Sequence, residues 1–153
     1  MTQTQAPTLT GQDIGEAEGA LTALLEQALA GTGTTRNEYI TLRVLAVRGP
    51  FTSPADLHEF LAQARQLRLD PPAVKDLLAA LEARALVSGT SLDGSGPAEL
   101  TEEGHELNAR LAEAVAPTTK QFFADFDPDE LATAHRVLVQ LVKRADRLRA
   151  GKR

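Results

Sequence analysis

The hydrophobic residues between positions 71 and 85 recur at helical spacing. Five of them lie three or four positions apart, as on one buried face of a helix: Val74, Leu77, Leu78, Leu81 and Ala85. Asp70 precedes them as a candidate N-cap, and Pro71 fits the first turn, where no backbone N–H is needed. The pattern therefore predicts a helix that starts sharply at residue 71 and buries one face.

A short hairpin is predicted directly after this helix. Two short apolar segments, Leu86–Val87 and Ala98–Leu100, are separated by a loop that holds three glycines and a proline. Thr101 then caps another helical pattern. Helix, hairpin and helix in this order predict a winged helix-turn-helix.

Two further helices are predicted ahead of residue 70. Thr35 and Glu38 form a candidate capping box for a helix over 36–47, and Ser53 caps a helix over 54–66. The helix over 54–66 and the helix after Asp70 would make the helix-turn-helix pair, with the helix over 36–47 behind them.

The two ends of the chain are predicted to form long helices, over 12–30 at one end and over 101–123 and beyond 127 at the other. Pro117 is expected to kink or break the helix over 101–123. Asp127 and Glu130 form a candidate capping box for the last helix. That helix carries an apolar seam that needs another surface, and the first helix with a second copy of the chain would supply it.

Composition agrees with packed helices. The 153 residues are 42% hydrophobic but only 4% aromatic, so the core must be built from Leu, Ala and Val. The predicted fold class is mainly α: six helices plus a short β-hairpin wing. We expect a disordered N-terminus over 1–10, a helical dimerisation region over 11–33 and 101–150, and a winged lobe over 34–100.

Several function classes are disfavoured by the residues present. The chain has no cysteine and no apolar run of about 20 residues, so we expect neither disulfides nor a membrane span. The N-terminus does not read as a signal peptide, which favours the cytoplasm. No nucleophile–base pair or phosphate-binding loop is recognisable, and the three histidines fall on different helices. We therefore expect no catalytic residues, no metal ligands and no cofactor.

Three segments resemble the MarR family of bacterial winged-helix regulators: LEARALV (81–87), LTEEGHEL (100–107) and DPDELATAHRVL (127–138). The resemblance extends over residues 12–150. It implies a homodimer with dimerising helices at both ends that binds double-stranded DNA at a palindromic operator, usually as a repressor. It also implies a small aromatic or phenolic effector bound between the dimer helices and the winged lobe.

The resemblance places DNA contacts in the first turns of the helix after Asp70. The matching positions include Pro72, Ala73, Lys75 and Asp76, of which only Lys75 is a ready donor. Asp76 stands where many members place an arginine. The basic residues expected to support this face are Arg48, Arg65 and Arg68. Arg84 is a further candidate, with pairing to an acid as the alternative reading.

Electrostatics leave a second function open. No Lys or Arg occurs from residue 85 to 109, so the wing is without a cation. Residues 36–100 hold seven basic and eight acidic residues, which leaves the lobe near neutral. The alternative is a winged-helix protein- or ligand-binding module with weak or lost sequence-specific DNA binding.

Four residues are candidates for an effector site. Tyr39 and Arg43 lie one helical turn apart and could hold an aromatic acid, with His105 and Asn108 reaching the same crevice from a later helix. In the alternative reading, Tyr39 belongs to the core and Arg43 forms an inter-helix salt bridge.

Overall fold

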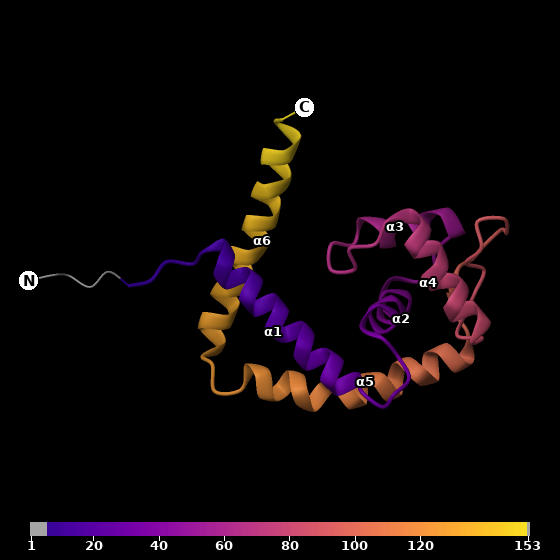
Figure 1. The fold of residues 1–153 in the computed structure, drawn as a ribbon, viewed down its shortest axis with the longest axis horizontal. Coiled ribbons are helices and arrows are strands. Elements are labelled where there is room, and N and C mark those ends of the chain that lie inside the picture. Colours follow the sequence, from indigo (N-terminus) through magenta and orange to yellow (C-terminus); the bar gives the residue numbers. More distant parts are fainter. Residues whose placement is uncertain (1–5, 153) are drawn as a thin grey trace, which may run out of the picture. The chain divides into compact units, whose positions relative to one another are not determined.

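The computed structural model describes residues 6–152, which fall into two compact units that divide between Thr118 and Thr119. The described residues form six helices and two strands (Figure 1): α1 (Gly11–Leu29), α2 (Arg36–Arg48), α3 (Pro54–Gln63), α4 (Pro71–Ala83), β1 (Val87–Ser88), β2 (Glu99–Leu100), α5 (Glu102–Phe123) and α6 (Pro128–Ala150). The predicted fold class, a mainly α winged helix-turn-helix, is confirmed.

The helix starts agree closely with the sequence patterns. Thr35 and Glu38 form the reciprocal capping box of α2, with N···O distances of 3.2 and 3.1 Å. Ser53 accepts a hydrogen bond from the backbone N–H of Asp56, and Asp70 caps α4 in the same way. Each cap satisfies a backbone donor that a helix start otherwise leaves unpaired.

The structure describes the N-terminal segment from residue 6 onward. Residues 6–10 form no helix or strand, yet Thr10 makes a capping box with Asp13 at the start of α1. The predicted disorder of residues 1–5 lies outside the described part of the chain. The predicted division into a dimerisation region and a winged lobe stays a prediction; by contacts within one chain, α1 and α5 up to Thr118 belong to the same unit as residues 34–100.

The core of the first unit is a cluster of leucines with a few other apolar side chains. The leucine and valine side chains with 1% or less of their surface exposed come from four helices: Leu42, Leu57, Leu61, Val74, Leu78, Leu81 and Leu111. Helix α3 packs against α4, and α3 ends at Gln63 rather than at residue 66. The earlier end arises because Ala64 donates to the carbonyl of Leu61, which tightens the last turn.

The prediction that Ala85 belongs to the buried face of α4 is wrong. Ala85 is exposed and has φ +58°, the left-handed conformation that ends helices. Its N–H bonds to the carbonyl of Glu82 at 2.9 Å, and the N–H of Leu86 bonds to that of Leu81 at 3.1 Å. These two bonds make a Schellman motif, so the chain has left the helix before Ala85 could reach the core.

Three antiparallel residue pairs hold the base of the wing. Val87 pairs with Leu100 and Ser88 with Glu99 in antiparallel register. Ala98, predicted as part of the second strand, instead exchanges two backbone hydrogen bonds of 2.9 Å with Phe51. The first strand starts one residue later than predicted because the N–H of Leu86 is used to end α4.

Gly104 lets α5 approach the base of the wing closely. A Cβ at this buried position would collide with the backbone carbonyl of Leu86. Thr101, as predicted, caps the helix: its hydroxyl accepts from the N–H of Gly104 and donates to the carbonyl of Ala85 at 2.6 Å.

Helix α5 runs without interruption through Pro117, so of the two expected effects the break is wrong and the kink stays a prediction. Buried Leu107, Leu111 and Val115 anchor the helix ahead of the proline, and one missing backbone bond does not end it. The expected capping box at α6 is also wrong. Asp127 accepts from the N–H of Asp129 at 2.9 Å, two residues on, so the carboxylate of Glu130 plays no part.

Helix α6 is an amphipathic helix without a buried residue in the second unit. Its exposed large apolar side chains are Leu138, Val139, Leu141, Val142 and Leu148. No helix within residues 6–152 is long and apolar enough to cross a membrane.

We expect Gly104→Ala to lower the free energy of unfolding by about 1–3 kcal/mol, because the added methyl overpacks the contact with Leu86. Chemical denaturation followed by circular dichroism measures this. Gly15→Ala on α1 is the matched control. A Cβ there meets nothing within 4 Å, so helix propensity should stabilise the protein by up to about 1 kcal/mol. Equal effects of the two substitutions would contradict the tight contact.

Candidate nucleic-acid interface

Helix α4 presents one face outward because its other face is committed to the core. Val74, Leu78 and Leu81 are buried, which turns Pro72, Lys75 and Asp76 toward solvent. Ala73 lies between the two faces and is half-buried. The structure therefore places the predicted α4 residues on the exposed side of the helix start, with Ala73 at its edge.

The charged side chains of Lys75 and Asp76 are available for an outside partner. Neither makes an ion pair or a hydrogen bond through its side chain with another residue among 6–152. Lys75 and Pro72 line an open cavity of about 560 Å³ together with His58 of α3 and Leu92 of the wing. Residues of α3, α4 and the wing therefore line one shared cavity.

The predicted basic residues lie on different elements. Arg65 and Arg68 are exposed in the turn between α3 and α4, as expected, and Arg68 has φ +51°, a conformation unusual for a residue with a side chain. One Arg68 nitrogen lies 3.9 Å from a carboxylate oxygen of Glu18 on α1. Arg48 ends α2, with its guanidinium 5.3 Å from the ring centre of Phe60.

Arg84 belongs to an internal ion pair. Its Nη1 donates to Oε2 of Glu38 at 2.8 Å, and the Glu38 side chain is only 13% exposed. Pairing with an acid was the alternative reading for this residue, and the geometry bears it out. The pair joins the end of α4 to the start of α2.

A side-chain network that sequence analysis missed holds the wing. Nε2 of His58 donates to the carbonyl oxygen of Thr90 at 2.7 Å, and the Thr90 hydroxyl donates to Oε2 of Glu82 at 2.7 Å. Thr90 is 2% exposed. A threonine in a glycine-rich loop carries no pattern that marks it as buried, so only the folded chain reveals this link between α3, the wing and α4.

Two of the four predicted effector residues come together. Tyr39 is 6% exposed, and the guanidinium of Arg43 lies 5.9 Å from its ring centre. Both line a cavity of about 270 Å³ with Arg48 and Gln66. Tyr39 thus contributes to the core, as the alternative reading expected, but no described acid forms a salt bridge with Arg43.

The other two effector candidates lie elsewhere. His105 and Asn108 are on α5, and neither lines the cavity beside Tyr39. His105 is exposed, while Asn108 is half-buried and its Oδ1 is a buried oxygen without a hydrogen-bond partner. Their role in an effector site stays a prediction.

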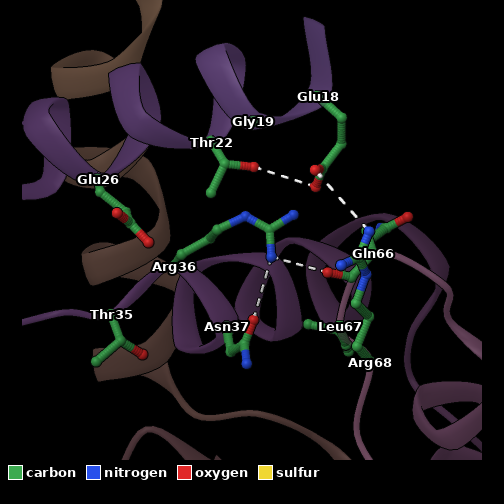
Figure 2. Close-up of a pocket in the computed structure, with 10 residues that line it drawn as sticks. All are labelled: Glu18, Gly19, Thr22, Glu26, Thr35, Arg36, Asn37, Gln66, Leu67 and Arg68. Carbon is green, nitrogen blue, oxygen red and sulfur yellow. Dashed lines mark hydrogen bonds and ion pairs between the residues drawn. The ribbon is translucent and has the colours of Figure 1, made fainter. Parts of the chain in front are cut away.

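A larger cavity of about 570 Å³ lies between α1, the start of α2 and the α3–α4 turn (Figure 2). Its centre is Arg36, whose Nη1 donates to the carbonyl oxygen of Gln66 at 2.8 Å. Sequence analysis did not single out Arg36. One feature of the sequence indicated a contact for Arg36: it directly follows the Thr35 cap, and side chains at a helix start often meet neighbouring loops.

Comparisons with known proteins show which solved structures share this architecture. No protein-family model matches the chain, and no curated protein matches it. Among solved structures, Mycobacterium tuberculosis MarR family protein Rv2887 in complex with DNA is 27% identical, with a TM-score of 0.63, and the alignment covers 88% of this chain and 98% of that one. The same protein with p-aminosalicylic acid gives 25% identity, a TM-score of 0.62 and coverage of 87% and 98%. Transcriptional regulator PA3341 gives 20% identity, a TM-score of 0.73 and coverage of 90% and 98%.

The chain has the MarR fold. The resemblance predicted from three short segments is thereby confirmed, and it extends over nearly the whole length of both chains. This MarR-like chain differs in two features from what the resemblance implies. Its wing has no cation, and Asp76 stands where an arginine is expected.

We expect the Thr90–Glu82 hydrogen bond to couple the wing to α4. In a double-mutant cycle with Thr90→Val and Glu82→Ala, the coupling energy for unfolding should be about 1–2 kcal/mol, since the bond involves a charged acceptor. Urea denaturation of the four proteins gives this energy. Effects of the two substitutions that add to within about 0.5 kcal/mol would contradict the coupling.

Proposed function

We propose that this protein is a homodimeric DNA-binding transcriptional regulator of the MarR type, acting as a ligand-responsive repressor. The observation that carries the proposal is the likeness over nearly the full length to Rv2887 in complex with DNA. The exposed start of α4 supports it, because the side chains that would meet base edges are turned outward from a rigid core.

In the proposed complex, α4 enters the major groove with Pro72, Lys75 and Asp76 leading. Lys75 is the donor for guanine or phosphate, and Asp76 can accept from the amino group of cytosine. Arg48, Arg65 and Arg68 contact phosphates beside it. With so few cations, affinity depends strongly on each of them, but only weakly on salt, because few counterions are released from the DNA.

The homodimer is supported by the exposed apolar face of α6. Leu141 and Val142 follow Leu138 by three and four positions, so the three side chains share one face, and they stay uncovered within one chain. A two-fold partner buries such a face on both copies at once. Two α4 helices related by that symmetry suit a palindromic operator.

Two observations support the proposal of an effector: a solved relative with a bound ligand, and a cavity beside Tyr39. Rv2887 has been seen with p-aminosalicylic acid. Here the cavity beside Tyr39 offers an aromatic wall and the Arg43 guanidinium for the carboxylate of a small aromatic or phenolic acid. His105 and Asn108 do not line this cavity, so the proposed site rests on Tyr39 and Arg43. The proposed function needs no catalytic residues. It requires access to the genome, which agrees with the cytoplasmic location expected from the sequence.

We expect Lys75→Gln to weaken operator binding about tenfold or more, because it removes the main donor at the start of α4. The operator is first selected from a pool of random duplexes, and affinity is then measured by fluorescence anisotropy. Arg84→Gln is the matched control: Arg84 is the cation at the C-cap of α4, but it is paired with Glu38, so its loss should change affinity less than twofold.

The cation-free wing and Asp76 favour the second function, a winged-helix module with weak DNA binding. Under that function the selection enriches no sequence, and Asp76→Arg raises binding to all duplexes alike. A selected sequence whose binding is lost in Asp76→Arg would instead support base reading by Asp76.

We expect Leu141→Glu to convert the dimer into a monomer of 16.4 kDa, because a carboxylate cannot be buried cheaply in an apolar interface. Light scattering coupled to size exclusion measures the mass. Gln140→Glu places the same charge on the adjacent residue and should leave the dimer intact. A monomeric parent protein at micromolar concentration would contradict the proposed assembly.

A further inference from the structure

Helix α6 has an apolar stripe with the spacing of a coiled coil. Its members follow one another at alternating intervals of three and four positions: Leu131, Ala134, Leu138, Leu141, Ala145 and Leu148. No residue of α6 is buried, and Leu138, Leu141 and Leu148 have 44%, 40% and 65% of their surface exposed. The stripe is therefore available to a second helix along its length.

The stripe is symmetric about its own centre. Counted outward from the point between residues 139 and 140, each position of the stripe is matched by the same residue type on the other side. The matched pairs are Leu138 with Leu141, Ala134 with Ala145, and Leu131 with Leu148. That point is also close to the middle of α6, which spans Pro128–Ala150. When two copies of the helix run antiparallel about a two-fold axis there, leucine meets leucine and alanine meets alanine.

The two ends of α6 carry charges of opposite sign. Residues 125–130 hold four acids and no Lys or Arg, whereas residues 143–152 hold five Lys or Arg and one acid. An antiparallel partner brings the acidic end of each copy beside the basic end of the other. A parallel partner would instead bring acids beside acids and cations beside cations, which disfavours association.

Charged groups at both ends are available for a partner. Glu130, Arg149 and Lys152 make no ion pair or side-chain hydrogen bond with another residue among 6–152. The same charges also complement the dipole of each helix by itself. The dipole does not account for an apolar stripe that is symmetric about the middle of the helix, whereas an antiparallel pair accounts for both features.

The other cations of α6 do not oppose this pairing. Arg136, Lys143 and Arg147 are exposed, and the 3.6-residue repeat puts them on the side of the helix away from the stripe. They stay in solvent when the stripe is covered, so the pairing brings none of them close to a cation of the other copy.

We propose that two copies of this chain join through an antiparallel pair of α6 helices, related by a two-fold axis that passes between residues 139 and 140. Leu131 of each copy packs against Leu148 of the partner subunit, and Leu138 packs against Leu141 of the partner subunit. The proposal rests on the homodimer of the proposed function and adds the orientation and register of its α6 helices. Opposite charges at the two ends select this orientation over the parallel one.

Paired cysteines test the orientation, because the chain has no cysteine of its own. The double variant Leu131→Cys with Leu148→Cys should form a disulfide-linked dimer under mild oxidation, and each single variant should not. Within one helix the two positions are about 25 Å apart, so the bond cannot close inside a chain. In a parallel pair each single variant would cross-link as well. Non-reducing electrophoresis separates the linked dimer from the monomer.

A charge reversal tests the electrostatic part. Arg149 flanks the stripe, so Arg149→Glu sets a carboxylate beside the acidic end of the partner, at two places in each dimer. We expect the dissociation constant of the dimer to rise about tenfold. Arg147→Glu is the matched control, because it makes the same change of charge on the outer side and should alter the constant less than twofold. Sedimentation over a dilution series gives both constants, and circular dichroism checks that the helix content is unchanged.

Light scattering on the unmodified protein separates this proposal from the homodimer itself. A monomer at micromolar concentration would overturn both. A dimer whose double cysteine variant does not cross-link, or whose single variants cross-link equally well, would overturn the antiparallel α6 pair and leave the homodimer standing. Equal effects of Arg149→Glu and Arg147→Glu would overturn the electrostatic selection of the orientation.

Discussion

Burial of the inner face of α4 is the constraint on which the rest of the first unit depends. Val74, Leu78 and Leu81 have at most 1% of their surface exposed and fix the helix rotationally against α3. Because a helix repeats every 3.6 residues, that choice also decides which side chains point outward. Lys75 and Asp76 face solvent for this reason, and the Schellman turn at Ala85 then directs the chain into the wing.

Charge is scarce on the surface that we propose for DNA, and much of it is already engaged. Arg84 is paired with Glu38, Arg68 lies near Glu18, and Arg48 lies over Phe60. Lys75 has no such contact within the described chain. On binding DNA, the proposed regulator would give up these weak internal contacts to form contacts with phosphates. Each such arginine would therefore contribute less binding free energy than a cation without an internal contact.

Local patterns predicted the fold well, because caps and apolar spacing are short-range properties. Thr35, Ser53 and Asp70 begin their helices as the sequence indicated. The error at Ala98 arose because a distant segment competes for its backbone groups, since Ala98 pairs with Phe51. The errors at Ala85 and Asp127 are local and concern how a helix ends or begins. Of the candidate site residues, those on α4 and in the turn were placed by periodicity. The hydrogen bonds from His58 to Thr90 and from Arg36 to Gln66 join residues 32 and 30 positions apart, and no local pattern encodes such meetings.

The hydrogen bonds that join His58, Thr90 and Glu82 affect how much conformational entropy the wing loses when it binds a partner. A glycine-rich loop that is free before binding must be ordered when it meets a partner, and that ordering opposes association. Here the base of the wing is already held by two hydrogen bonds of 2.7 Å. A wing whose base is fixed in advance loses less conformational freedom on contact, so even a wing without a cation can add to affinity through its shape.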